Sequence, residues 1–137
     1  METSRVKYIG KLRTSAIHCE SDTVLITDAP RDNNGNGESF SPTDLTATSL
    51  ASCMLTIMGI VARNHGIVFE HAEASVRKHM ASAPRRIEKI EVGITISGKN
   101  YTAKERRLLE QGALNCPVAK SLHPDIAQVV SFDYADN

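Results

Sequence analysis

Hydrophobic and polar residues alternate in short runs through the first third of the chain. This alternation predicts three short strands, at residues 6–12, 16–19 and 23–27. Residues 29–41 then combine Asn, Gly and Asp with few side chains to bury, so we expect a long loop there. A loop of this length in a compact domain is usually functional or mobile.

One long apolar segment follows this loop, and its start carries residues that begin a helix. Ser41 suits the N-cap, Pro42 suits the first helical position, and Asp44 is the acidic residue three places after the cap. The pattern predicts a helix from Pro42 to about Asn64, ending near Gly66. Apolar residues cover most of its circumference, which is typical of a central, buried helix.

The second half of the chain alternates strand patterns with helix patterns. Strand patterns appear at residues 67–80, 87–97 and 129–134. Helix patterns appear between the last two of these strands, at residues 102–114 and 117–122. This order predicts a single domain, residues 1–137, with an α+β fold in which the helices are grouped on a mainly antiparallel sheet.

Composition narrows the class of protein. The chain has 137 residues, and its 16 basic residues balance 16 acidic ones. A net charge of zero argues against a dedicated nucleic-acid binder and gives no support for a polybasic membrane anchor. The first ten residues lack the apolar run of a signal peptide, and the longest apolar stretch, residues 50–62, is too short to span a bilayer. We therefore expect a soluble, cytoplasmic protein.

Three cysteines are the main candidates for chemistry, and their odd number does not indicate a secreted disulfide framework. Cys53 lies in the apolar helix, where a cysteine is most often an inert core residue. Cys116 precedes Pro117 and so occupies the N-cap of the next short helix, where backbone N–H groups lower a thiol's pKa. Cys19 has no evident partner. Spacing alone leaves open whether Cys53 and Cys116 meet.

Other chemistries have little support in the sequence. No C-x-x-C or H-x-x-x-H pair indicates a zinc site, and the five histidines are scattered. The sequence also contains no phosphate-binding loop and no nucleophile elbow. No metal or organic cofactor is expected.

Two cysteine motifs carry a resemblance to a known family. The first is residues 40–45 (FSPTDL) followed by Cys53, which stands eleven residues after Pro42. The second is residues 115–119 (NCPVA), which precede the last expected strand. Together they resemble the OsmC/Ohr family of osmotically inducible and organic-hydroperoxide-resistance proteins, in particular its OsmC-like branch. The resemblance spans nearly the whole chain and implies the OsmC-like fold in an intertwined homodimer.

The resemblance implies a thiol peroxidase for oxidative-stress defence. In the family, the cysteine matching Cys53 reacts with the peroxide, and the one matching Cys116 resolves the resulting sulfenic acid as a disulfide. The implied substrate is an organic or lipid hydroperoxide, and the implied reductant is a dithiol, from a lipoyl-type protein or thioredoxin. The alternative is an OsmC-like stress protein with weak or no peroxidase activity, which binds another small apolar or electrophilic ligand in the dimer cleft.

The family activates its reactive thiol with an arginine that is held by a glutamate near the start of the helix. Burial raises the pKa of a thiol unless a cation offsets the desolvation, which is why the arginine matters. Thr43 occupies the usual glutamate position here, and the carboxylate falls one residue later, at Asp44. Asp44 also suits the capping box. Arg31 is the first candidate for the arginine and Arg13 the second, with Glu38 as an alternative carboxylate.

Overall fold

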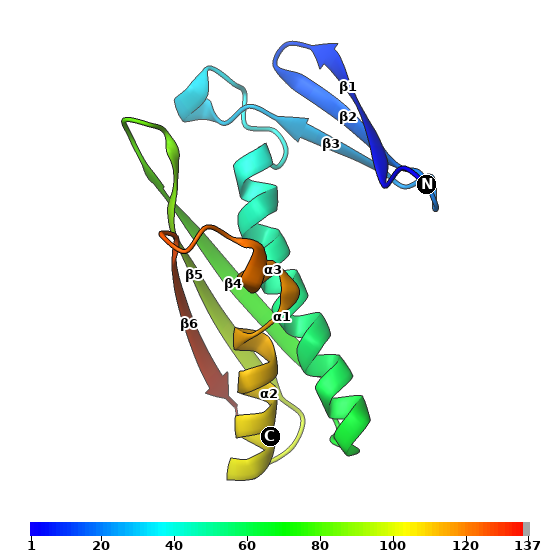
Figure 1. The fold of residues 1–137 in the computed structure, drawn as a ribbon, viewed down its shortest axis with the longest axis vertical. Helices are drawn as coiled ribbons and strands as arrows, with labels where there is room; N and C mark the ends of the chain where they lie inside the picture. The colour runs from blue at the N-terminus through cyan, green and yellow to red at the C-terminus, as the bar shows by residue number, and fades with distance from the viewer. Residues whose placement is uncertain (136–137) are drawn as a thin grey trace. The chain divides into compact units, whose positions relative to one another are not determined.

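The computed structural model describes residues 1–135 and contains two compact units (Figure 1). The first unit comprises Met1–Thr46, and the second begins at Ala47, within a long helix. The elements, in chain order, are β1 (Ser4–Gly10), β2 (Arg13–His18), β3 (Val24–Asp28), the short 3₁₀ helix η1 (Arg31–Asn33), α1 (Pro42–His65), β4 (His71–Ala81), β5 (Arg86–Ser97), α2 (Ala103–Leu114), α3 (Pro117–Ser121) and β6 (Ala127–Tyr134). Every strand and helix that the sequence predicts is present, with ends that differ by a few residues.

The first unit is built on a three-stranded antiparallel sheet in the order β1-β2-β3. The strand predicted through Leu12 ends at Gly10. The reason is that Gly10, Lys11 and Leu12 all have positive φ angles, which extended strand backbone does not adopt. These three residues make the turn that returns the chain into β2.

Residues 29–41 form the long loop, and hydrogen bonds hold it against β3. The Glu38 backbone N–H donates to Asp28 Oδ2 at 2.9 Å. At Gly35, a Cβ atom would lie 1.8 Å from the Ala29 carbonyl oxygen, so only glycine fits this close approach. The loop therefore has a specific backbone conformation rather than being an unstructured connection.

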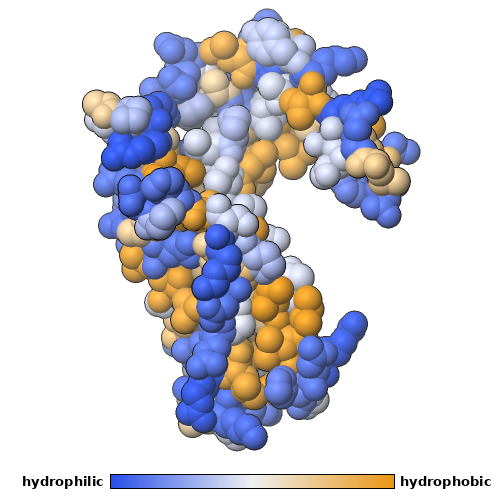
Figure 2. Space-filling view, in the orientation of Figure 1, coloured by the Kyte–Doolittle hydropathy of each residue, from blue (hydrophilic) through white to orange (hydrophobic). Residues whose placement is uncertain are grey.

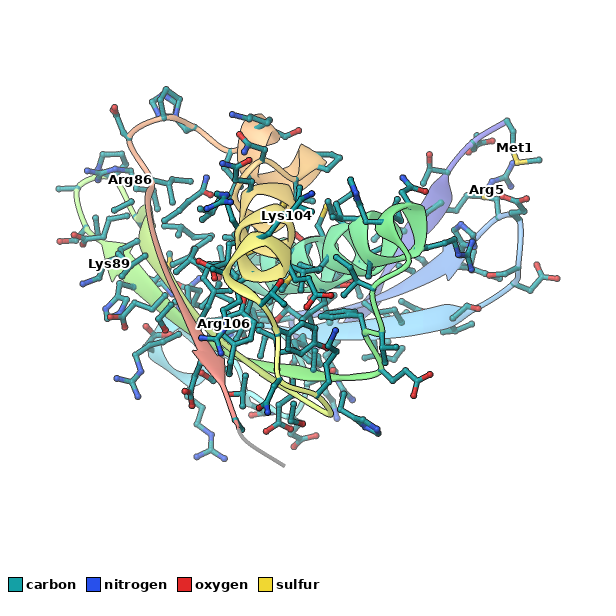
Figure 3. All side chains as sticks on the ribbon, turned by 90° about the horizontal axis from the view of Figure 1, so that it is seen from below. Met1, Arg5, Arg86, Lys89, Lys104 and Arg106 are labelled. Carbon is teal, nitrogen blue, oxygen red and sulfur yellow. The ribbon has the colours of Figure 1, made fainter. Side chains whose placement is uncertain are left out.

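The second unit has a three-stranded sheet of its own, in the order β4-β5-β6. β4 and β5 form an antiparallel hairpin, whereas β6 runs parallel to β5, with Ile94 paired to Phe132. A parallel neighbour requires a crossover connection, which α2 and α3 supply here. α1 and α2 lie on the same face of this sheet (Figures 1 and 3). The mainly antiparallel arrangement predicted from the sequence thus contains one parallel pair.

The core of the second unit lies between this sheet and its helices. Alternate residues of β5 are buried, as the alternation in the sequence predicts, and they are Ile90, Val92, Ile94 and Ile96. The buried residues of α1 recur at helical spacing and are Ala47, Leu50, Ala51, Met54, Met58 and Ala62. Leu109 and Ala113 form the buried face of α2. Each large apolar side chain buried in this way stabilises the unit by roughly 1.5–3 kcal/mol.

α1 buries one face within this chain, while other apolar side chains on it remain accessible. Ile60 is 48% exposed, and Ile57 and Val61 are half-buried. Figure 2 shows hydrophobic side chains at the surface of the second unit beside a band of hydrophilic residues. By length and composition alone α1 is able to cross a membrane, but its buried face forms the centre of the core.

A cluster of aromatic and charged side chains fastens α2 to the end of β6. The Arg106 guanidinium, labelled in Figure 3, lies 4.4 Å from the centre of the Tyr134 ring, and Tyr134 Oη donates to Glu110 Oε2 at 2.9 Å. Arg106 Nε donates to the Tyr101 carbonyl oxygen at 3.1 Å, and Tyr101 Oη donates to the Val68 carbonyl oxygen at 2.7 Å. Burial, and then the hydrogen bond to Glu110, raises the pKa of the Tyr134 hydroxyl. These contacts fix α2, which leads directly into α3.

Candidate active site

Cys53 lies near the middle of α1 and is partly buried against the core of the second unit. Residues four apart share one side of a helix, so Cys53, Ile57 and Val61 form a single stripe along α1. Ile57 and Val61 lie against Gly112 of α2, which shows that this stripe faces α2. The Cys53 thiol is thus directed at the segment that follows α2 in the chain.

Cys116 occupies the N-cap of α3, as the sequence predicts, and its side chain is buried. Its Sγ accepts a hydrogen bond from the Ala119 backbone N–H at 3.4 Å. Its own backbone N–H donates to the Ala113 carbonyl oxygen, in the last turn of α2, at 3.3 Å. Pro117 supplies the first helical residue of α3. The thiol is therefore held between the end of one helix and the start of the next.

The structure brings these two thiols together, which the spacing in the sequence left open. The Cys53 thiol packs against the core cluster that contains Cys116, and it is close enough to the Cys116 thiol to raise its pKa. Both cysteines are free thiols rather than a disulfide. Neighbouring thiols are positioned for the exchange chemistry by which an oxidised sulfur is converted into a disulfide.

The ionisation of Cys116 differs from the prediction. Its position at a helix N-cap led us to expect a lowered pKa, but burial raises the pKa of the Cys116 thiol above its ordinary value. The hydrogen bond from the Ala119 N–H acts in the opposite direction, and the neighbouring Cys53 thiol raises the pKa further. Desolvation is the largest of these effects, and a five-residue helix offers only a few N–H groups against it.

Asp44, the candidate activating carboxylate, forms a reciprocal cap at the start of α1. The Ser41 backbone N–H donates to Asp44 Oδ2 at 3.0 Å, and the Asp44 backbone N–H donates to Ser41 Oγ at 3.0 Å. This is the capping role that the residue spacing suggested. Thr43, in the position of the family's glutamate, lies with its Oγ1 3.2 Å from Ser41 Oγ. A role for Asp44 in thiol activation stays a prediction.

Arg31, the first candidate for the activating cation, lies on the exposed loop of the first unit. Its Nε donates to the Asn36 carbonyl oxygen at 3.3 Å, so the side chain contacts its own loop. The role of Arg31 also stays a prediction.

Arg13, the second candidate for the activating arginine, has an acidic neighbour, Asp28, that the sequence analysis did not identify. Arg13 Nε lies 3.7 Å from Oδ1 of Asp28, whose side chain is fully buried. Within the part of the chain that the structure describes, neither of these two atoms has a hydrogen-bond partner. The signal in the sequence was weak: an acidic residue, Asp28, directly after the predicted strand at residues 23–27.

The other candidate features carry no assembled chemistry. Cys19 is a partly buried free thiol just after β2 in the first unit. Among residues 1–135, no group of three or more His, Cys, Asp or Glu side chains is placed to hold a metal ion. A polar surface depression of about 410 Å³ at the start of β4, lined in part by Glu70 and Glu73, contains no cysteine. The paired thiols are therefore the candidate site.

A family model described as OsmC-like protein matches residues 35–129 of the chain. That range includes the start of α1, both paired cysteines and most of β6. No protein of curated function matches this sequence at significant similarity.

Solved structures of similar fold include one with close sequence similarity. A Psychrobacter arcticus protein, proposed to be an osmotic-stress-induced and detoxification response protein, is 54% identical over 96% of both chains, with a TM-score of 0.92. The organic hydroperoxide resistance protein OsmC from Legionella pneumophila is 18% identical over 97% of this chain and 98% of its own, with a TM-score of 0.76. An organic hydroperoxide resistance protein from Elizabethkingia anophelis is 16% identical over 98% of both chains, also with a TM-score of 0.76. The last two share the fold.

Proposed function

The chain belongs to the OsmC-like protein family, and from that premise we propose that it is a thiol peroxidase that reduces organic hydroperoxides. One observation carries the proposal. The partly buried Cys53 thiol is a neighbour of the buried Cys116 thiol in the core of the second unit, although 63 residues separate the two in the sequence. A dithiol peroxidase needs this arrangement of one reacting sulfur and one resolving sulfur.

In the first step, the Cys53 thiolate attacks one oxygen of the hydroperoxide. A sulfur–oxygen bond forms while the oxygen–oxygen bond breaks, and two electrons pass from sulfur to the peroxide. The alkoxide takes up a proton and leaves as an alcohol, and Cys53 becomes a sulfenic acid. Because Cys53 lies against the apolar core of the second unit, an organic hydroperoxide is a better match to its surroundings than hydrogen peroxide.

In the second step, the Cys116 thiolate attacks the sulfur of the Cys53 sulfenic acid. The disulfide bond forms, the sulfur–oxygen bond breaks, and the hydroxide takes up a proton and leaves as water. This step protects Cys53 from irreversible oxidation to sulfinic and sulfonic acids. An external dithiol, such as a lipoyl-type protein or thioredoxin, then returns two electrons and two protons to the disulfide. In the cytoplasm, the location we propose, thiols are kept reduced between turnovers.

We also propose that the working form is a homodimer. The support lies in the accessible apolar side chains of α1, among which Ile60 is 48% exposed, and in the zero net charge, which opposes association only weakly. Sedimentation should give about twice the 14.9 kDa chain mass at micromolar concentration. Ile60→Glu should shift the protein towards the monomer, because it places a charge in a surface that must be desolvated. A wild-type monomer would contradict the proposal.

The test of the peroxidase is the mass of the reduced protein after one equivalent of cumene hydroperoxide, followed by peptide mapping. We expect a loss of about 2 Da and a peptide in which Cys53 is linked to Cys116. Cys53→Ser should abolish turnover, whereas Cys116→Ser should accumulate the Cys53 sulfenic acid. Cys19→Ser is the matched control and should behave as the wild type. Turnover retained in Cys53→Ser would refute the mechanism.

The alternative function, an OsmC-like stress protein with weak or no peroxidase activity, has one observation in its favour. The carboxylate nearest the family's glutamate position belongs to Asp44, and it is engaged in the helix cap, while Thr43 stands in that position itself. Under this alternative, cumene hydroperoxide leaves the thiols unreacted or oxidises them slowly and without selectivity. Cys53→Ser would then leave the affinity for the bound ligand nearly intact.

Arg31 and Arg13 are the two arginines we propose for activation of Cys53. Arg31→Ala and Arg13→Ala separate them if the rate of sulfenic acid formation is measured in the Cys116→Ser background. In variants that circular dichroism shows to be folded, loss of about 10²-fold or more in one variant only would identify the activating residue, since removal of one stabilising charge has an effect of that size. Arg5, exposed on β1 and paired with Glu2, offers the control Arg5→Ala.

A further inference from the structure

Gly112, in the last turns of α2, lies directly against α1. A Cβ atom at this position would be 2.9 Å from Val61 Cγ2 and 3.4 Å from Ile57 Cγ2. The first distance is shorter than ordinary carbon–carbon contact, roughly 3.5–4.0 Å. Val61 is β-branched and has little rotamer freedom in a helix, so its methyl group does not move aside readily. Any larger residue at 112 therefore pushes α2 away from α1.

The residues that touch Gly112 belong to the stripe of α1 that carries Cys53. Cys53, Ile57 and Val61 follow one another at four-residue spacing, which places them in a row along the helix. On the opposite side of the contact, Cys116 follows Gly112 after four residues. The two segments run in opposite directions along each other. Gly112 therefore lies against Ile57 and Val61, and Cys116, four residues later, lies beside Cys53, four residues before Ile57.

The end of α2 is connected rigidly to Cys116. The Cys116 backbone N–H donates to the Ala113 carbonyl oxygen, and the Asn115 backbone N–H donates to the carbonyl oxygens of Gln111 and Gly112. The Asn115 side chain adds a hydrogen bond from Nδ2 to the Gln111 carbonyl oxygen at 2.8 Å. A displacement of the last turn of α2 is therefore passed on to the Cys116 sulfur.

We propose that Gly112 is a positioning residue for the disulfide-forming step: the absence of its Cβ sets the separation of α2 from α1, and this sets the separation of the Cys116 and Cys53 sulfurs. The inference rests on the proposed function, because it concerns the attack of Cys116 on the Cys53 sulfenic acid. Glycine is among the poorest helix formers, so its presence within α2 has to be offset by this close packing.

The test substitutes Gly112→Ala and follows a single turnover with one equivalent of cumene hydroperoxide. Sulfenic acid is trapped with dimedone, and the disulfide is measured by mass after alkylation of the remaining thiols. Relief of the clash requires a shift of roughly 0.6–1 Å, and a misplacement of about 1 Å can cost 10²-fold. We expect disulfide formation to slow at least about tenfold in Gly112→Ala, with the rate of sulfenic acid formation unchanged.

Two further variants separate positioning from a general effect on the fold. Gly59→Ala is the matched control, because it makes the same change within a helix, but its Cβ would meet Phe69 Cδ2 at an ordinary 4.0 Å. The Gly59→Ala variant should form the disulfide at the wild-type rate. Adding Val61→Ala to Gly112→Ala removes the methyl group that the new Cβ meets, and it should restore most of the rate. Wild-type kinetics in a folded Gly112→Ala protein, or failure of the double variant to recover, would overturn the proposal.

Failure of the proposed function has a different signature. If peroxide does not oxidise Cys53 in the wild type, the peroxidase proposal fails, while the positioning of the thiols is still measurable with diamide. Diamide accepts two electrons and two protons as one thiol adds to its N=N bond and the second thiol displaces the hydrazine. Disulfide formation with diamide should also be slowed at least about tenfold in Gly112→Ala and not in Gly59→Ala. Equal rates in these variants would overturn the positioning role independently of any peroxidase activity.

Discussion

Arg13 and Asp28 form an ion pair in the first unit whose two members differ in exposure. Arg13 Nε and Asp28 Oδ1 are 3.7 Å apart, and the side chain of Asp28 is fully buried while that of Arg13 is 33% exposed. The Glu38 backbone N–H donates a hydrogen bond to Oδ2 of this carboxylate at 2.9 Å. Arg13→Ala leaves the buried carboxylate without its counter-charge, which makes it the sharpest perturbation of this unit.

The size of the effect follows from the distance. Two unit charges 3.7 Å apart attract by about 1 kcal/mol at the dielectric constant of water and by about 4.5 kcal/mol at an effective value of 20. Removal of one partner of a fully buried pair costs about 3–5 kcal/mol, and the exposure of Arg13 reduces this figure. We expect Arg13→Ala to lower the free energy of unfolding by about 2–4 kcal/mol. Asp28→Asn should cost about 1–2 kcal/mol, because the amide keeps the bond from Glu38 and Arg13 stays partly hydrated.

The decisive comparison is the double variant, Arg13→Ala with Asp28→Asn. The double variant replaces the Asp28 carboxylate that Arg13→Ala leaves buried without a counter-charge. It should therefore be more stable than Arg13→Ala alone by about 1 kcal/mol or more. Urea denaturation followed by far-UV circular dichroism, with hydrogen exchange of the β2 and β3 amides, measures the stability of this unit. Arg5→Ala, which breaks the exposed pair with Glu2, is the control and should change stability by less than about 0.5 kcal/mol. A double variant no more stable than Arg13→Ala would refute the reasoning.

Three further outcomes are expected. Tyr101→Phe removes the donor of a 2.7 Å bond to a backbone carbonyl oxygen and should lower the free energy of unfolding by about 1–3 kcal/mol in urea denaturation. Gly35→Ala places a Cβ 1.8 Å from the Ala29 carbonyl oxygen, so hydrogen exchange of the loop amides should accelerate by at least about tenfold, and an unchanged exchange rate would contradict the loop conformation. Burial raises the pKa of Cys116, and only the thiolate attacks. Formation of the disulfide from a preformed Cys53 sulfenic acid should therefore accelerate by roughly tenfold per pH unit as the pH rises from 7 to 8.5 in rapid-quench measurements. A rate that does not change with pH would count against a raised pKa.

Local patterns in the sequence were sufficient for the elements. The alternation from Ile90 to Ile96 marks β5 because side chains of a strand point to opposite faces in turn. Ser41, Pro42 and Asp44 mark the start of α1 because capping involves only residues within one turn of each other. The same holds for the N-cap position of Cys116. Each of these features depends on neighbours a few residues away.

Several features depend on residues that are distant in the chain, and only the tertiary structure decided them. The meeting of Cys53 with Cys116 and the pairing of Arg13 with Asp28 require the elements to pack first. The raised pKa of Cys116 follows from desolvation, which is a property of the packed surroundings and outweighs the local effect of the helix N-cap. The sequence determines which groups can react and which elements carry them. Packing determines which groups meet and how they ionise, because burial and Coulomb interactions depend on separation in space.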